Sequence, residues 1–246
     1  GRVLRARGIV HVLLMALSVK DVKQSDLFRG LICVSLQLRV RGAIAVLPDH
    51  FQCMTLLCAE LLERGFRRPA LLICPALDRS GMDRAIAAFR DCHRLFGHAS
   101  EPPLLFEEQC DARTLDAWLR RHRPDVIIES WRGVRQREFD PHEKEWADWL
   151  HRYRPELFDS RVRSAASLRR LLEPYPYVLL DCILDGETGI DSNREYCGRK
   201  AVDILLGANR RGEPLQPQNS YCLVVEGRWV GDLPAPSRKA RASQRL

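Results

Sequence analysis

Two carboxylates stand directly after apolar segments, at positions where a small polar molecule can be bound. Asp181 follows the apolar segment 177–180, and Asp49 follows the segment 43–47 after a single proline. Acidic residues at the carboxyl ends of strands often contact ligands in open α/β sheets. A carboxylate can accept hydrogen bonds from two hydroxyls of a sugar. Each residue has a structural alternative, because Asp181 can cap a loop and Asp49 can cap the helix that follows, which is the favoured role for Asp49.

Ser130 and Trp131 form a second candidate pair, because they follow the apolar segment 126–128. The serine hydroxyl can donate or accept a hydrogen bond. The Trp131 ring can stack on the face of a sugar, although packing in the core accounts for a tryptophan here equally well. Together with Asp49 and Asp181, these residues predict a binding site for a small molecule and not a reaction centre.

The chain lacks the short motifs of common enzyme and cofactor sites. It contains no GxGxxG, no phosphate-binding GxxxxGK[ST] loop, no GxSxG elbow and no HExxH. The seven histidines are isolated, and the nine cysteines include no CxxC. We therefore expect no catalytic residue, no metal site and no cofactor. An α/β enzyme that uses a cleft carboxylate remains a rival interpretation, because catalytic groups need not be neighbours in the sequence.

Composition limits the kind of protein. The chain has 246 residues, enough for one large domain or two small ones, and no apolar run long enough to cross a bilayer. An odd number of cysteines at irregular spacing argues against a disulfide framework and favours a reducing, cytoplasmic setting. Of the 39 basic residues, 34 are arginines spread along the chain, so the net charge of +7 does not mark a nucleic-acid-binding patch. The tail 233–246 is basic and is expected to be disordered.

Short apolar segments alternate with amphipathic ones along most of the chain. This alternation predicts a parallel α/β fold. The expected strands are 10–16, 31–36, 43–47, 70–74, 126–128, 177–180 and 221–225. The expected helices start at Asp49 and end at Gly65, run over 82–96, surround 115–119, and run over 193–206. Residues 131–175 do not follow this rhythm.

Several ordered motifs resemble the lactose-repressor (LacI/GalR-like) family of transcription regulators. They are RARGI at 5–9, LPDHF at 47–51 with ERGFRRP at 63–69, and GIDSNREYCGRKAVDIL at 189–205 followed by RGEP at 211–214. In their order along the chain they are similar to the family's effector-binding domain. The segment 131–175 lacks the family's usual approach to the strand before Asp181, and no DNA-reading helix-turn-helix can be recognised.

The resemblance implies a periplasmic-binding-protein-like fold, with two doubly wound parallel-sheet lobes joined by crossing strands. It places residues 1–67 and 188–232 in lobe one, which would be incomplete, and residues 68–187 in lobe two. An effector, usually a sugar or another small metabolite, would bind in the cleft between the lobes. Arg84 matches a family position whose arginine donates hydrogen bonds to effector hydroxyls through its guanidinium. The alternative is that Arg84 is a solvent-facing arginine on a helix, with no role in binding.

The implied function is effector sensing by a DNA-binding regulator, in which ligand binding alters the DNA affinity of a head that this chain lacks. With such a head, the protein is expected to be a homodimer and to have no membrane partner. A free-standing sugar- or solute-binding protein of the same fold is the main alternative. The cysteine usage and the absence of a recognisable export signal argue against that alternative.

Overall fold

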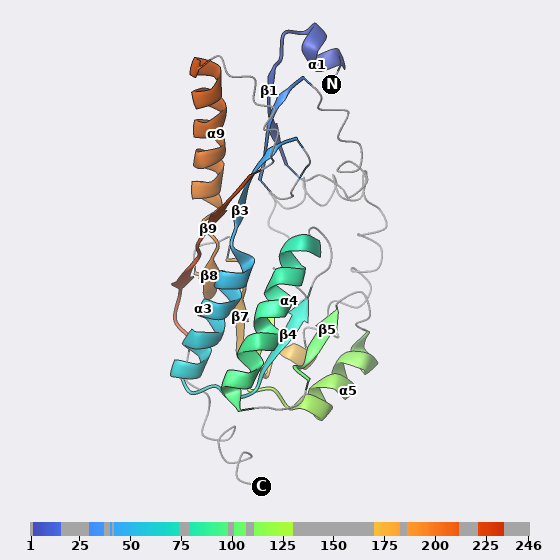
Figure 1. Ribbon diagram of the computed structural model, residues 1–246. Helices are drawn as coiled ribbons and strands as arrows, with labels where there is room; N and C mark the ends of the chain where they lie inside the picture. The colour runs from blue at the N-terminus through green and yellow to red at the C-terminus, as the bar shows by residue number, and fades with distance from the viewer. Residues whose placement is uncertain are drawn as a thin grey trace.

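The computed structural model describes residues 2–15, 30–36, 40, 42–73, 79–97, 101–106, 111–129, 170–182, 186–211 and 221–233, and contains two β-sheets stacked end to end (Figure 1). Ser130, Trp131 and the tail from residue 234 lie outside the described residues. In the part of the chain that is described, no helix is long and apolar enough to span a bilayer.

The first sheet has four parallel strands in the order β1-β2-β3-β9. They are β1 (His11–Leu14), β2 (Ile32–Ser35), β3 (Ile44–Pro48) and β9 (Cys222–Val225). Helix α9 (Arg194–Arg211) covers one face, with Cys197 and Ala201 against Val34, Ile44 and Val46. The short helix α1 (Arg2–Ala6) contributes to a smaller apolar cluster that includes Leu14, Leu31 and Cys33.

The second sheet has the strand order β10-β8-β7-β6-β4-β5. Its strands are β4 (Pro69–Ile73), β5 (Leu104–Phe106), β6 (Val126–Glu129), β7 (Tyr177–Leu179), β8 (Gly189–Asp191) and β10 (Arg228–Val230). All neighbours are parallel except β10, which runs antiparallel to β8. This sheet forms the lower half of the molecule in Figure 1.

Helices cover both faces of the second sheet, which explains its continuous apolar strands. Helices α3 (His50–Glu63) and α4 (Arg79–His93), the latter followed by the short helix η2 (Arg94–Phe96), pack on one face. Helix α5 (Ala112–His122) packs on the other. Every residue of β4 and of β6 is buried, as strands between two helical layers require.

Helix boundaries follow local capping chemistry. The Asp49 carboxylate accepts a hydrogen bond from the Gln52 amide at 3.2 Å and thereby caps α3. Gly65, with φ +91°, follows the end of that helix. Asp111 caps α5 in the same way through the Thr114 amide at 2.6 Å. Gly97, with φ +82°, ends the helical segment after α4.

Within the described residues the chain passes between the two sheets three times. The three crossovers are residues 48–50 from β3 to α3, residues 191–194 from β8 to α9, and residues 225–228 from β9 to β10. In Figure 1 they lie together between the upper and the lower sheet. Crossing segments of this kind act as hinges in two-lobed α/β proteins.

Because of these crossovers, the boundary between the two sheets lies at other residues than the lobe boundary expected from the sequence. Helix α3 was expected in lobe one, within residues 1–67, but its apolar face packs on the second sheet. Strands β8 and β10 were expected in lobe one, within 188–232, but they pair with β7 and with each other in the second sheet. Helix packing and strand pairing are tertiary choices, which a one-dimensional pattern does not encode. We therefore propose two lobes, one built around each sheet.

Candidate functional site

The Asp181 carboxylate is the centre of a buried polar cluster at the second crossover. Asp181 follows β7, and only 2% of its surface is exposed. Its Oδ1 accepts hydrogen bonds from the Ser192 hydroxyl at 2.5 Å and from Arg194 Nε at 3.0 Å, and its Oδ2 forms an ion pair with Arg194 Nη2. Ser192 is itself completely buried. The carboxylate is thus held by two residues of the segment that leaves the second sheet for α9.

Arg194 connects this buried cluster with the protein surface. Its side chain remains 48% exposed, although one edge of the guanidinium is committed to Asp181. Burial lowers the pKa of Arg194, and the neighbouring Cys197 thiol opposes that shift. The group stays charged at neutral pH, because an arginine guanidinium does not lose its proton in proteins. Its remaining N–H donors are therefore available to an oxygen-rich ligand.

Hydrogen bonds tie the three crossovers to one another. The Asn193 side-chain amide donates to the Glu226 carbonyl at 2.6 Å, which joins the second crossover to the third. The Asp49 amide donates to the Val225 carbonyl at 2.8 Å, which joins the first to the third. Asn193 has φ +56°, a left-handed conformation that asparagine tolerates better than most residues. The three crossovers are therefore joined to one another by direct hydrogen bonds.

The third crossover also packs tightly against the second lobe. A Cβ atom on Gly227 would lie 2.7 Å from both Cys53 Sγ and Ile190 Cγ2, so no larger residue fits there. Next to it, Arg228 donates through Nε to Asp191 at 3.0 Å and links β10 to the end of β8. The amide of Asn193 donates to the other oxygen of Asp191 at 2.8 Å. Asp191 therefore links the second crossover, through Asn193, to the third crossover, through Arg228.

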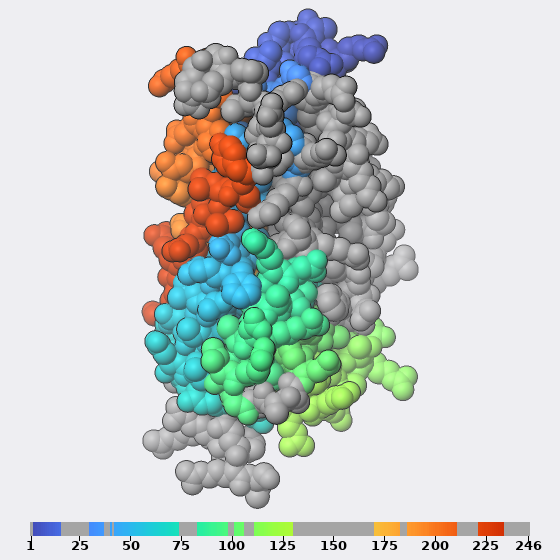
Figure 2. Space-filling view, in the orientation of Figure 1, coloured from blue at the N-terminus to red at the C-terminus, as the bar shows by residue number. Residues whose placement is uncertain are grey.

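A groove of about 1180 Å³ runs beside these crossovers. It is lined by the first turns of α9, by β9 and β10, and by residues just before β8. In Figure 2 the red residues of β9 and β10 and the orange residues of α9 share one side of the molecule. The groove is lined by both polar and apolar side chains, among them Arg194, Tyr196, Arg199, Val225, Glu226 and Arg228. A pyranose or furanose ring presents hydroxyls and an apolar face, which such a mixture can bind.

The site residues predicted from the sequence have different surroundings. Asp181 is buried and ion-paired, as described above. Asp49 caps α3 and is partly exposed at the first crossover. Arg84 is exposed in the first half of α4 and is not one of the groups that hold Asp181. Ser130 and Trp131 lie outside the described residues, and among the described residues no group of three side chains is arranged to bind a metal ion.

Sequence reasoning missed the residues that hold Asp181. Ser192 and Arg194 belong to the helix motif that resembles the lactose-repressor family, but their pairing with Asp181 depends on the path of the second crossover. The sequence analysis also did not single out Glu129, a buried carboxylate that ends β6 next to β7 and is not among the groups that hold Asp181. The signal that could have revealed Glu129 is its place after three apolar residues of a strand.

The comparisons with known proteins bear on the fold. No protein-family model and no curated protein matches the sequence. Among solved structures, a LacI family regulator from Enterococcus faecium with bound ribose superposes with a TM-score of 0.61 at 16% identity, over 95% of this chain and 83% of the other. A periplasmic binding protein/LacI regulator from Alkaliphilus metalliredigens with D-xylulofuranose gives 0.61 at 13%, over 96% and 81%. A LacI regulator from a Rhodococcus species gives 0.62 at 14%, over 96% and 81%.

The chain has a periplasmic-binding-protein-like fold. The fold class predicted from the sequence is confirmed, and the resemblance to LacI-type regulators holds at the level of the fold. In a periplasmic-binding-protein-like fold, ligands bind where the carboxyl ends of the strands of both lobes meet. Asp181 and Asp49 are at such ends, one in each sheet.

Proposed function

We propose that this chain is the effector-sensing part of a LacI-type transcription regulator, and that it binds a sugar or a similar polyhydroxylated metabolite where the two lobes meet. The observation that carries this proposal is the cluster of Asp181, Ser192 and Arg194. It joins the end of a strand in the second sheet to the first residue of the helix that covers the first sheet. A ligand that engages this cluster contacts both lobes, and its binding energy can change their relative orientation.

The bound sugars of similar folds support the ligand class. Ribose and D-xylulofuranose are bound by two of the proteins with this fold, and both present neighbouring hydroxyls. The chemistry of the cluster suits such groups, because the Arg194 guanidinium keeps donors free and a carboxylate has about four lone-pair sites, of which Asp181 uses three. Arg84, Asp49, Ser130 and Trp131 remain predicted contacts on the ligand.

We predict that Arg194→Ala and Asp181→Asn both weaken effector binding. Arg194→Ala removes the exposed donors, and Asp181→Asn removes the charge that orients them. Loss of one charge-assisted hydrogen bond costs about 1.5–3 kcal/mol, or roughly ten- to a hundredfold in affinity. Calorimetric titration against a panel of pentoses, hexoses and disaccharides would measure the affinities, with thermal melts of each variant to check folding.

Two further variants test the position of the site. Arg84→Ala is expected to weaken binding of the same sugar about tenfold if one hydrogen bond is lost. Arg120→Ala is the matched control, since Arg120 is also an exposed helical arginine but pairs with Asp116 on α5, at 3.0 Å. It should bind as the unaltered protein does. Unchanged affinity in both the Asp181 and the Arg194 variants, in folded protein, would refute the proposed site.

We also predict that this chain alone does not recognise a specific DNA sequence. No helix-turn-helix can be read in it, and its positive charge is dispersed, so only non-specific binding to phosphates is expected. Such binding should fall steeply as salt is added. Footprinting on genomic fragments at two salt concentrations would measure both properties, and protection of a discrete operator would contradict the prediction.

A further inference from the structure

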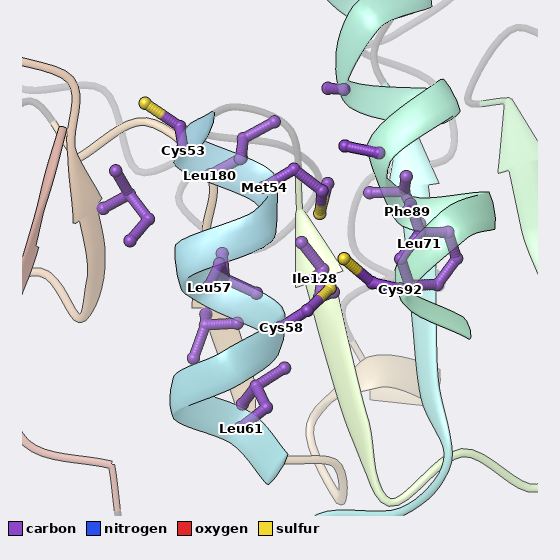
Figure 3. Packing of buried hydrophobic residues seen from close by; sticks show 14 of the residues in the cluster. Cys53, Met54, Leu57, Cys58, Leu61, Leu71, Phe89, Cys92, Ile128 and Leu180 are labelled. Carbon is purple, nitrogen blue, oxygen red and sulfur yellow. The ribbon is translucent and has the colours of Figure 1, made fainter. Parts of the chain in front are cut away.

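Two buried thiols from different helices meet in the core of the second lobe. Cys58 lies in the middle of α3, and Cys92 lies next to the last residue of α4. Figure 3 shows their sulfur atoms turned toward each other between the helices, with Met54 and Ile128 nearby. The Cys58 and Cys92 side chains are hydrogen-bonded to each other. Both cysteines are free, and their side chains belong to one apolar cluster.

The two thiols differ in acidity because of this contact. Donation from the Cys58 thiol to the Cys92 sulfur is the largest influence and lowers the pKa of Cys92 to about 7, whereas burial acts in the opposite direction. The same hydrogen bond, together with burial, raises the pKa of Cys58 far above its usual value. The Thr55 hydroxyl of α3 also lowers the pKa of Cys92, and the Asp91 carboxylate of α4 raises it. The contact therefore favours the thiolate on Cys92 and the neutral thiol on Cys58.

Cys92 is the less deeply buried of the two cysteines. It is 4% exposed against 1% for Cys58. The exposed residue Thr55, one turn before Cys58 on α3, lies beside Cys92. Local opening of a fold exposes buried groups to small reagents, and we expect such a reagent to reach Cys92 before Cys58.

We propose that Cys58 and Cys92 are a peroxide-reactive dithiol that closes to a disulfide between α3 and α4. In the first step the Cys92 thiolate attacks hydrogen peroxide, forms a sulfur–oxygen bond and releases hydroxide, which leaves a sulfenic acid on Cys92. In the second step the Cys58 sulfur attacks the Cys92 sulfur and the sulfenic hydroxyl leaves as water with the proton of Cys58. In sum, two thiols lose two hydrogens and one peroxide becomes two waters.

The disulfide would connect the two helices that cover one face of the second sheet. It closes a loop that contains β4 and most of α4, so it would restrict how α3 and α4 move against each other. This modification site is separate from the cluster around Asp181 and does not depend on the proposed ligand.

The test is peptide mapping of the full chain after a short exposure to dilute hydrogen peroxide, with free thiols then blocked by iodoacetamide. Trypsin releases Cys92 alone in the peptide 91–94, and releases Cys58 together with Cys53 in the peptide 42–64. We expect these two peptides to be joined in most molecules, with the loss of two hydrogens, and to separate after reduction by dithiothreitol.

Three variants identify the sulfurs that react. Cys53→Ala is the matched control, because Cys53 is equally buried on the same helix but packs against Gly227, away from Cys92. It should form the bridge as before. Cys58→Ala should stop at the sulfenic acid on Cys92, which a dimedone probe labels, and Cys92→Ala should form no bridge from Cys58. If peroxide leaves Cys92 free in the unaltered chain, or joins it to another cysteine, the proposal is wrong.

Discussion

Replacing Gly189 by alanine is expected to lower the free energy of unfolding by more than about 4 kcal/mol. Losses of this size are exceptional for a single substitution, and strain at an unusual backbone conformation is one of their causes. Gly189 opens β8 with φ +146°, a conformation that residues with a Cβ rarely adopt. A Cβ there would lie 2.0 Å from the Leu179 carbonyl oxygen and 2.7 Å from the Leu179 nitrogen. The Leu179 amide donates to the Thr188 carbonyl at 2.9 Å, so the two strands cannot separate without breaking their pairing.

Gly198→Ala is the control for this prediction. Gly198 lies inside α9, and nothing is within 4 Å of the position that its Cβ would occupy. Because glycine weakens a helix by roughly 0.5–1 kcal/mol relative to alanine, Gly198→Ala should stabilise the first lobe slightly. Urea unfolding followed by circular dichroism measures both variants. Equal midpoints for Gly189→Ala and the unaltered chain would show that β7 and β8 do not approach as closely as described.

The sequence was informative wherever burial is continuous along an element. The apolar segments 70–74 and 126–128 predicted strands, and β4 and β6 occupy them, because strands buried on both faces are apolar without interruption. Helix ends were also readable, since Asp49 and Gly65 act through neighbours in the sequence. The strands β5, β8 and β10 were not predicted, because each has three residues and none stands in an apolar segment as long as 177–180, where the equally short β7 was predicted.

The candidate site was only partly readable for a related reason. Asp181 could be recognised, because a carboxylate after an apolar strand is a local feature. Its partners Ser192 and Arg194 are separated from it by 11 and 13 residues, and the turn of the second crossover brings them back. The packing of α3 on the second sheet could not be predicted for the same reason, because tertiary contacts decide which sheet a helix covers.

Raising the pH from 8 to 10 is expected to destabilise the protein by roughly 5–6 kcal/mol, because five buried thiols lose about 1.4 kcal/mol each and Cys92 offsets about one of them. Burial raises the pKa of Cys33 and Cys197 from 9.0 to about 11, and that of Cys53 and Cys182 to about 12. The pKa of Cys58 is raised by its hydrogen bond with Cys92 and by burial.

The sign of the effect follows from the unfolded state, where each thiol ionises near its ordinary pKa. Below pH 9 these thiols are neutral in both states, so their contribution to stability is complete. Above pH 9 the unfolded chain ionises first, and stability falls until the pH passes the folded pKa. Cys92 acts in the opposite sense, because its lowered pKa contributes stability above pH 9 that disappears as the pH falls through 7. Its contribution therefore still grows by about 1.4 kcal/mol between pH 8 and pH 10, and this gain offsets the loss from one of the five thiols.

A loss of roughly 5–6 kcal/mol is a large part of the whole stability of a typical domain, which is about 5–15 kcal/mol. We therefore expect the protein to be much less stable at pH 10 than at pH 8. Denaturant unfolding at pH 8 and pH 10, under reducing conditions, measures the difference in the free energy of unfolding.

Cys53→Ala should reduce that difference by about 1.4 kcal/mol, since one titrating group is removed. Leu61→Ala, which truncates a fully buried side chain on the same helix, should cost the same at both pH values. If Cys53→Ala instead behaves like Leu61→Ala, thiol ionisation is not what destabilises the fold in alkali.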